Sequence, residues 1–405
     1  GALAAVGSAY TLMVFLISVL LGLAMGSGTV FSLHYGAGNH VALRHSIFSS
    51  FVLIGIVTLI LNVAVFIWLD PILRLLQVPQ DIYGMMRSYL WIIFCGIVFT
   101  FIYNFYASLL RAVGDSVTPL WFLAVSVVLN IALDLFFILQ LDWGIQGAAA
   151  ATVLAQGVAA LGIIIYTYRR RPELRWHHED MCFDRTCLKE IASFSTLTCV
   201  QQSVMNLGIL MVQGLVNSFG SAVMAAFAVA VKIDTIAYMP VQDFGNAFSV
   251  FTAQNFGAGK HDRIKSGIKQ SLISVVLFCF AVSTAVFFLS EPLMSLFCSD
   301  SETVAIGVQY LRTEGLCYIG IGILFMLYGY YRAVNKPLMS VILTILSLGT
   351  RVLLAYILSP VSTFGVMGIW VSIPIGWFLA DTAGIGYYIL RERCLLYTSP
   401  SPRDA

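Results

Sequence analysis

Long apolar segments follow one another along this 405-residue chain, and only short polar stretches separate them. A helix needs about 20 mostly apolar residues to cross the hydrocarbon core of a bilayer. Only 10% of the residues are charged, whereas soluble globular domains carry roughly 25%. The chain is therefore predicted to be a polytopic membrane protein. Its eleven expected spans lie at about 2–33, 41–68, 82–108, 116–140, 144–168, 190–218, 221–256, 264–290, 302–333, 337–358 and 364–390.

The same pattern excludes several other classes of protein. No span shows the two-residue alternation of a membrane β-barrel, so an all-α fold is predicted. The net charge is only +2 and the basic residues lie in short connections, so nucleic acid is not an expected partner. No catalytic constellation or metal-ligand spacing is apparent, so we expect no enzyme, no metal and no cofactor.

The distribution of Lys and Arg predicts the orientation in the membrane. Sixteen of these residues fall in connections on one side, whereas only Arg74 and Arg87 fall on the other. Cytoplasmic loops retain an excess of basic residues. We therefore expect the chain to begin outside and the connection 169–189 to be cytoplasmic.

The two halves of the chain repeat each other in one register. Gly36-Ala37-Gly38 matches Gly257-Ala258-Gly259, and Arg111-Ala112-Val113 matches Arg332-Ala333-Val334, each pair differing by 221 in residue number (257 minus 36). Such agreement in loops at both faces indicates a duplication. Six spans per repeat imply parallel repeats, which place a substrate cavity between two lobes.

The repeat also predicts the domain limits. The first lobe would comprise 1–168, the cytoplasmic linker 169–189 and the second lobe 190–393. The first lobe holds five spans against six in the second, so its first span is expected to be missing. The polar, Pro-rich segment 394–405 is expected to be a non-native tail.

The order of several motifs resembles the multidrug and toxic compound extrusion (MATE) family, in its DinF-like bacterial branch. The motifs that carry the resemblance are Gly36-Ala37-Gly38-Asn39, Leu110-Arg111-Ala112-Val113-Gly114-Asp115 with Pro119, Asn130 to Asp134, Met239 to Phe248, and Gln254 to Gly259. The resemblance covers about residues 2–390. It implies twelve helices in the parent protein, of which eleven are present here, and cation-coupled export of varied, often cationic and aromatic compounds.

Asp134 is the strongest candidate for the coupling site, because an ionisable residue inside a membrane span is costly and usually functional. Asn130 lies one helical turn earlier, and Thr152 is as far after the outer turn at Trp143 as Asp134 is before it. The resemblance implies the same role, since the family has an aspartate on this helix with an asparagine and a threonine nearby. Satisfaction of Asp134 by neighbouring helices is the alternative.

The second half is not chemically equivalent to the first. By the repeat, Asn130 corresponds to Arg351 and Asp134 to Ala355. Some branches of the family carry a sodium-linked acidic pair in the second lobe, and no clear match for it is visible in the sequence. Proton coupling is therefore favoured over sodium coupling.

Further polar residues in the spans are candidates for the substrate cavity, with a structural network as the alternative. Pro240 is expected to bend or break its helix and to free backbone groups beside them. The candidates are Tyr103, Asn104, Gln156, Gln201, Gln202, Asn206, Lys232, Asp234, Gln242, Asp243 and Arg351. Glu314 is expected near the outer interface, and Asp381 is expected to be structural.

The leading hypothesis is an antiporter that exports organic cations or drugs against an inward flow of protons, by alternating access. A flippase for lipid-linked precursors, built on the same duplicated fold, is the alternative. The expected partners are small-molecule cations and membrane lipid, and the expected state is a monomer.

Overall fold

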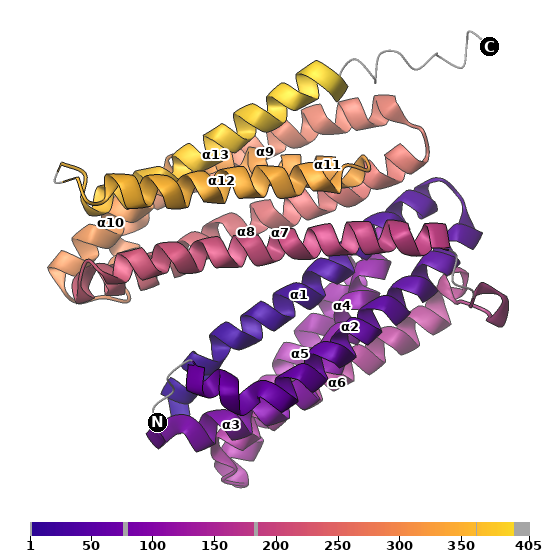
Figure 1. Ribbon diagram of the computed structural model, residues 1–405, viewed down its shortest axis with the longest axis horizontal. Coiled ribbons are helices and arrows are strands. Elements are labelled where there is room, and N and C mark those ends of the chain that lie inside the picture. The colour runs from indigo at the N-terminus through magenta and orange to yellow at the C-terminus, as the bar shows by residue number, and fades with distance from the viewer. Residues whose placement is uncertain (1, 76–79, 182–184, 362, 393–405) are drawn as a thin grey trace. The chain divides into compact units, whose positions relative to one another are not determined.

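The computed structural model describes residues 2–75, 80–181, 185–361 and 363–392, with side chains at 13–74, 82–181, 185–361 and 363–390. Helices make up nearly all of these residues, which contain no strand, so the all-α prediction is confirmed (Figure 1). The predicted tail at 394–405 lies outside them. The long helices of the first part are α1 (Ala2–Gly36), α2 (His40–Leu75), α3 (Gln80–Cys95), α4 (Ile97–Ala112), α5 (Val117–Leu135) and α6 (Gly144–Arg170). Those of the second part are α7 (Arg185–Asn217), α8 (Ser221–Gly257), α9 (His261–Ser295), α10 (Ser301–Gly315), α11 (Tyr318–Ala333), α12 (Pro337–Leu358) and α13 (Val366–Tyr387).

The number of spans agrees with the prediction. Nine helices among the described residues are long and apolar enough to cross a membrane, and two bent helix pairs raise the number to eleven if each pair is one span. The bent pairs are α3 with α4, at 43°, and α10 with α11, at 52°. Both had been expected as single uninterrupted helices, at 82–108 and 302–333.

The two bends occur at equivalent points of the repeat, around Gly96 and Cys317 (317 minus 96 is 221). A Cβ atom at Gly96 would lie 2.6 Å from Cγ2 of Val153, so only glycine lets α6 approach this closely. At the second bend the N–H of Cys317 donates to the carbonyl of Glu314 (2.9 Å), which ends α10 with a tighter turn. The duplication thus preserved a broken helix in each half.

Pro240 does not break α8, which was one of the two outcomes that the sequence predicted for it. The helix is continuous from Ser221 to Gly257 and contains Pro240 in its interior. Proline removes one backbone hydrogen bond, and a membrane helix tolerates this when packing holds the other turns. Here α8 packs along both α10 and α11.

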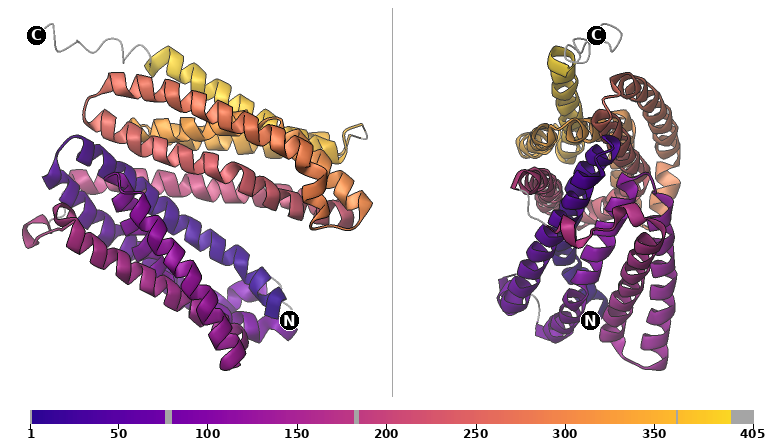
Figure 2. Two further views of the ribbon diagram at one scale, coloured as in Figure 1. Left: turned by 180° about the vertical axis from the view of Figure 1, so that it is seen from behind. Right: turned by 90° about the vertical axis from the view of Figure 1, so that its right-hand side faces the viewer.

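The described chain forms two compact units, residues 1–202 and 203–405, and each has its own apolar core. Figure 2 shows the helices of each unit running side by side. Trp370 lies in the core of the second unit. Its ring stacks on that of Phe227, with 5.5 Å between the ring centroids, and forms a T-shaped pair with Tyr310, with 4.9 Å between the centroids. Inside lipid such contacts stabilise by close packing rather than by exclusion of water.

The division between the units falls inside α7, because its first half packs against α1. Ser27 and Ser195 share a hydrogen bond of 2.8 Å. A Cβ atom at Gly26 would lie 2.5 Å from the carbonyl oxygen of Phe194. Small residues at a contact let two membrane helices approach closely. The lobe limits 1–168, 169–189 and 190–393 stay a prediction from the repeat.

The connection between α6 and α7 is fastened to the first unit. The ring of Trp176 lies against Phe48 and Phe51. Asp180 accepts hydrogen bonds from Nε of Arg44 (2.9 Å) and from the backbone N–H of His177 (2.8 Å). Burial by itself would raise the pKa of Asp180, but these two donors outweigh it and hold the pKa below its ordinary value.

We expect Gly26→Ala to weaken the contact between α1 and α7. The added methyl group must push the backbone of α7 away, which costs about 1–3 kcal/mol. The measurement is the thermal unfolding temperature of the purified protein in detergent, and a decrease is expected. Gly214→Ala on α7 is the matched control, because no atom lies within 4 Å of its added methyl group. An equal effect of both changes would contradict the close contact.

We expect Asp180→Asn to loosen the connection between α6 and α7 and to lower stability by about 1–2 kcal/mol at neutral pH. Because the pKa of Asp180 is lowered in the folded state, its contribution exists above the unfolded pKa and is lost as the pH falls through the folded one. Thermal unfolding temperatures of variant and wild type should therefore converge as the pH falls below the ordinary pKa of an aspartate. Asp142→Asn, in the exposed α5–α6 turn, should leave the unfolding temperature unchanged at every pH. A difference that persists at acid pH would argue against this role.

Candidate functional site

Two helices of the first unit bring together the polar residues predicted for coupling. Asn130 lies on α5 and Thr152 on α6, and Nδ2 of Asn130 donates to Oγ1 of Thr152 over 3.4 Å. The hydroxyl of Thr152 in turn donates to the carbonyl of Ala148 (3.0 Å). The pairing of α5 with α6 therefore brings Asn130 and Thr152 into contact, whereas the sequence had placed Thr152 at the depth of Asp134.

Asp134 lies one turn beyond Asn130 on α5, next to a short π-helical segment at Phe136–Gln140. Its Oδ1 atom is buried and has no hydrogen-bond partner among the described residues. Tyr89 of α3 is close enough to interact electrostatically with it. A local π-helix often marks a functional position, and an unsatisfied carboxyl oxygen inside a membrane is costly. One carboxyl oxygen of Asp134 thus lacks the partner that the structural alternative expects, and the role of this residue stays a prediction.

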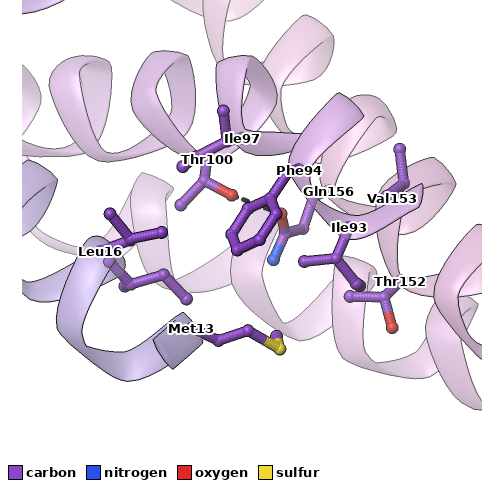
Figure 3. Close-up of a pocket in the computed structure, with 10 residues that line it drawn as sticks. Met13, Leu16, Ile93, Phe94, Ile97, Thr100, Thr152, Val153 and Gln156 are labelled. Atoms are coloured by element: carbon purple, nitrogen blue, oxygen red, sulfur yellow. Dashed lines mark hydrogen bonds between the residues drawn. The ribbon is translucent and has the colours of Figure 1, made fainter. Parts of the chain in front are cut away.

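A small cavity opens beside this polar group in the first unit (Figure 3). Its volume is about 30 Å³, and Thr152 and Gln156 of α6 line it together with Met13, Ile93 and Thr100. The hydroxyl of Thr100 donates to Oε1 of Gln156 over 2.6 Å. A cavity of this size holds water or a small ion.

The second unit contains a larger cavity, with a volume of about 110 Å³. Asp234 of α8, Glu314 of α10 and Arg351 of α12 line it, and the two acids are only 4% and 1% exposed. The hydroxyl of Tyr318 donates to Oδ1 of Asp234 over 2.6 Å. The structure thus places an acidic pair in the second unit, which the sequence had not revealed.

The charges in this cavity restrict its protonation. The carboxyl groups of Asp234 and Glu314 interact directly with each other, and both interact with Arg351. No ion pair joins Arg351 to either acid among the described residues, and its Nε atom has no hydrogen-bond partner. Two adjacent buried carboxylates cannot both be ionised. The arrangement therefore favours one shared proton and one negative charge, balanced by Arg351.

The two cavities occupy equivalent places in the repeat, although their chemistry differs. Their lining residues correspond when 221 is added to the residue number in the first unit. The corresponding pairs are Met13 and Asp234, Ile17 and Tyr238, Ile93 and Glu314, Thr100 and Ile321, and Gln156 and Trp377. Acids therefore stand in the second unit where the first has apolar side chains, and the acid of the first unit, Asp134, corresponds to the buried Ala355.

The other candidates from the sequence lie apart from these cavities. Tyr103 donates to the carbonyl of Pro119, and Asn104 donates to that of Thr100. Gln202 donates to Sδ of Met25. The remaining candidates differ in exposure: Gln201 is buried, Asn206 and Gln242 are partly buried, and Lys232 and Asp243 are exposed.

Sequence reasoning missed the most buried member of the acidic pair. Glu314 had been expected near the outer interface, but it lies in the core at the C-terminal end of α10. A signal was present, because Tyr310, Glu314 and Tyr318 recur every four residues. Such spacing aligns polar side chains on one helix face, although the bend after Gly315 lies within it.

Comparison with known proteins places the chain in a family. The family model MatE matches residues 1–136 and 198–357. The chain belongs to the MATE family. MATE proteins are membrane transporters and not enzymes, in agreement with the absence of a catalytic motif in the sequence.

Individual MATE proteins resemble the chain over most of its length. "Probable multidrug resistance protein YoeA" of Bacillus subtilis is 28% identical over 96% of this chain and 85% of its own length. "Probable multidrug resistance protein YpnP" of the same organism is 29% identical over 96% of this chain and 86% of its own. A crystal structure of a MATE protein in the bent conformation superposes with a TM-score of 0.93 at 22% identity, over 98% of this chain and 89% of that one. The MATE fold is thereby established.

We expect Arg351→Met to destabilise this MATE protein, because it leaves the negative charge of the Asp234–Glu314 pair without compensation. Breaking a buried charge pair costs about 3–5 kcal/mol. Adding Asp234→Asn should restore stability, since the cavity is then neutral again. Thermal unfolding of the purified variants measures both steps.

The control for this rescue is Asp243→Asn in the Arg351→Met background, an identical change at an exposed position of α8. It should give no rescue. Equal rescue by both second changes would show that total charge, rather than the balance within the cavity, decides stability.

Proposed function

We propose that this protein exports organic cations or drugs from the bacterial cytoplasm in exchange for protons. Membership of the MATE family supports transport, and the names of its B. subtilis relatives support drugs as the cargo. The observation that carries proton coupling is the buried, unpartnered Oδ1 of Asp134 beside Asn130 and Thr152. A single chain, surrounded by membrane lipid, is the proposed transporting unit.

Asp134 acts in this proposal as a proton switch. In an apolar surrounding the neutral carboxyl is favoured, because an ionised one loses its hydration. When water or a cation reaches the group, the ionised form is favoured and the proton leaves. Proton binding and cargo occupancy then bias the same alternating-access equilibrium in opposite directions.

The acidic cavity of the second unit suits a coupling ion better than a drug. Drug-sized ligands occupy pockets of roughly 300–1,000 Å³, whereas this cavity measures about 110 Å³. Its carboxyl groups and the hydroxyl of Tyr318 are oxygen donors of the kind that hard cations prefer. Sodium is therefore the second candidate coupling ion, with Asp234 and Glu314 as its ligands.

The lipid-flippase alternative expects a strongly cationic cavity. The second unit instead combines two acids with one arginine around its cavity. Aromatic side chains also line it, among them Tyr238, Phe325 and Trp377. Acidic and aromatic groups attract cations, which favours cationic cargo over an anionic lipid precursor.

We expect Asp134→Asn to abolish proton-driven uptake of a fluorescent cation, such as ethidium, into everted membrane vesicles. With an acidic interior and no sodium, wild type should accumulate the dye. Asp262→Asn, at an exposed position in the first turn of α9, is the matched control and should retain uptake.

Other outcomes contradict the proposal in distinct ways. Uptake by Asp134→Asn equal to that of wild type would exclude Asp134 as the proton switch. Uptake that requires a sodium gradient and is lost in Glu314→Gln would establish sodium coupling through the second unit. Absence of dye transport together with rescue of a lipid-flipping defect would favour the flippase.

A further inference from the structure

Asp381 is a buried acid that neither cavity uses. It lies on α13, its side chain is 4% exposed, and both carboxyl oxygens lack a hydrogen-bond partner among the described residues. The ionised form of such a group is strongly disfavoured, since nothing replaces its lost hydration. The group is therefore expected to be neutral in this conformation.

The helices that pack against α13 carry several hydroxyl groups, and no basic side chain forms an ion pair with Asp381 among the described residues. Helix α11 contributes Tyr328 and Tyr331, and the hydroxyl of Tyr331 donates to the carbonyl of Gly384 (2.6 Å). Helix α12 contributes Ser340 and Thr344, which donate to backbone carbonyls. Helix α10 packs on α13 as well, and there it brings Tyr310 against Trp370.

The basic residues of α11 and its C-terminal turn are engaged elsewhere. Arg332 donates to Asn246 (3.2 Å) and Ser249 (3.4 Å) of α8. The amino group of Lys336 lies 5.3 Å from the centre of the Tyr387 ring. An ion pair to Asp381 is absent among the described residues, so a structural salt bridge does not explain an acid at this position.

Asp381 is connected to the acidic cavity through Tyr328. The lining of that cavity includes Tyr328, Ser347 and Trp377, and Trp377 lies one helical turn before Asp381. Tyr328 interacts electrostatically with Asp381, and its hydroxyl also interacts with Thr344. A chain of hydroxyl groups next to water-sized space is a route by which a proton can move.

The repeat shows that this acid belongs to the second unit alone. Its equivalent in the first unit is Ala160 (381 minus 221), which is fully buried. Along α13, Asp381 lies toward the end that the distribution of Lys and Arg places at the cytoplasm. It is therefore separate from Asp134 and from the Asp234–Glu314 pair.

We propose that Asp381 is a further proton-binding site of this transporter, which exchanges its proton with the acidic cavity past the hydroxyls of Tyr328 and Thr344. The role of Asp381 in transport rests on the proposed proton coupling. Proton binding at Asp381 itself can be measured without any transport assay. The site binds its proton in the dry conformation described here and releases it when the cytoplasmic half of the second unit admits water.

Infrared difference spectroscopy of the full chain in lipid nanodiscs tests this site. Spectra at acid and alkaline pH are compared for wild type, Asp381→Asn and the exposed control Asp243→Asn. We expect a carbonyl band of a protonated carboxyl that disappears as the pH rises. The band should be lost in Asp381→Asn and kept in Asp243→Asn. Asparagine has the size of the neutral acid, so the variant should fold.

A second variant tests the route. Tyr328→Phe removes one hydroxyl while leaving the ring, and it should keep the Asp381 band but slow its exchange with deuterium oxide. An Asp381 band that is present at every pH would overturn the proposal, because the acid is then permanently neutral. Identical spectra of wild type and Asp381→Asn would also overturn it. A titrating Asp381 band together with normal dye efflux by Asp134→Asn would uphold this site and refute the coupling role of Asp134.

Discussion

The structure depends on the requirement that every backbone polar group inside a membrane finds a partner within its own segment. A helix meets this requirement without help, so the described chain is almost entirely helical. The same requirement makes polar side chains in the spans conspicuous, because each must be satisfied by a neighbour or by a ligand. Most are satisfied by backbone carbonyls, as Ser32 is by that of Gly28 and Thr58 by that of Ile54. Asp134 and Asp381 retain buried carboxyl oxygens without such partners.

Gene duplication supplied one architecture twice and left each copy free to acquire its own charges. Both units contain a bent span, and both enclose a cavity at the equivalent place. The acids are not at equivalent positions, since Asp234 and Glu314 replace Met13 and Ile93, and Ala355 replaces Asp134. Both units therefore have a cavity at the same place, but the ionisable residues that line it differ. This asymmetry is consistent with a transporter in which the two units handle different steps of proton or cation binding.

The buried acids of the two units all pose the same question of charge balance. A carboxyl group in an apolar unit can be neutral, or it can be ionised beside a cation, and the free-energy difference between the two depends on hydration. Arg351 is available to the Asp234–Glu314 pair, whereas Arg332 is engaged with Asn246 and Ser249 and leaves Asp381 without a counter-ion. The three acids of the second unit are thus held in different electrostatic settings. In the proposed proton exchange, these different settings would let the three acids bind and release protons at different steps.

The sequence alone was sufficient for the number of spans, the all-α class and the duplication, because these follow from local composition and from repeated spacing. It placed Thr152 at the depth of Asp134, and the structure brings Thr152 against Asn130, one turn away on the same helix. The coupling role of Asp134 stays a prediction. It failed where the outcome depends on how helices rotate and pack. The bends at Gly96 and Cys317, the continuity of α8 through Pro240 and the meeting of Asp234 with Glu314 are of this kind. Which face of a helix turns inward is decided by contacts with helices distant in the sequence, and only the tertiary structure supplies them.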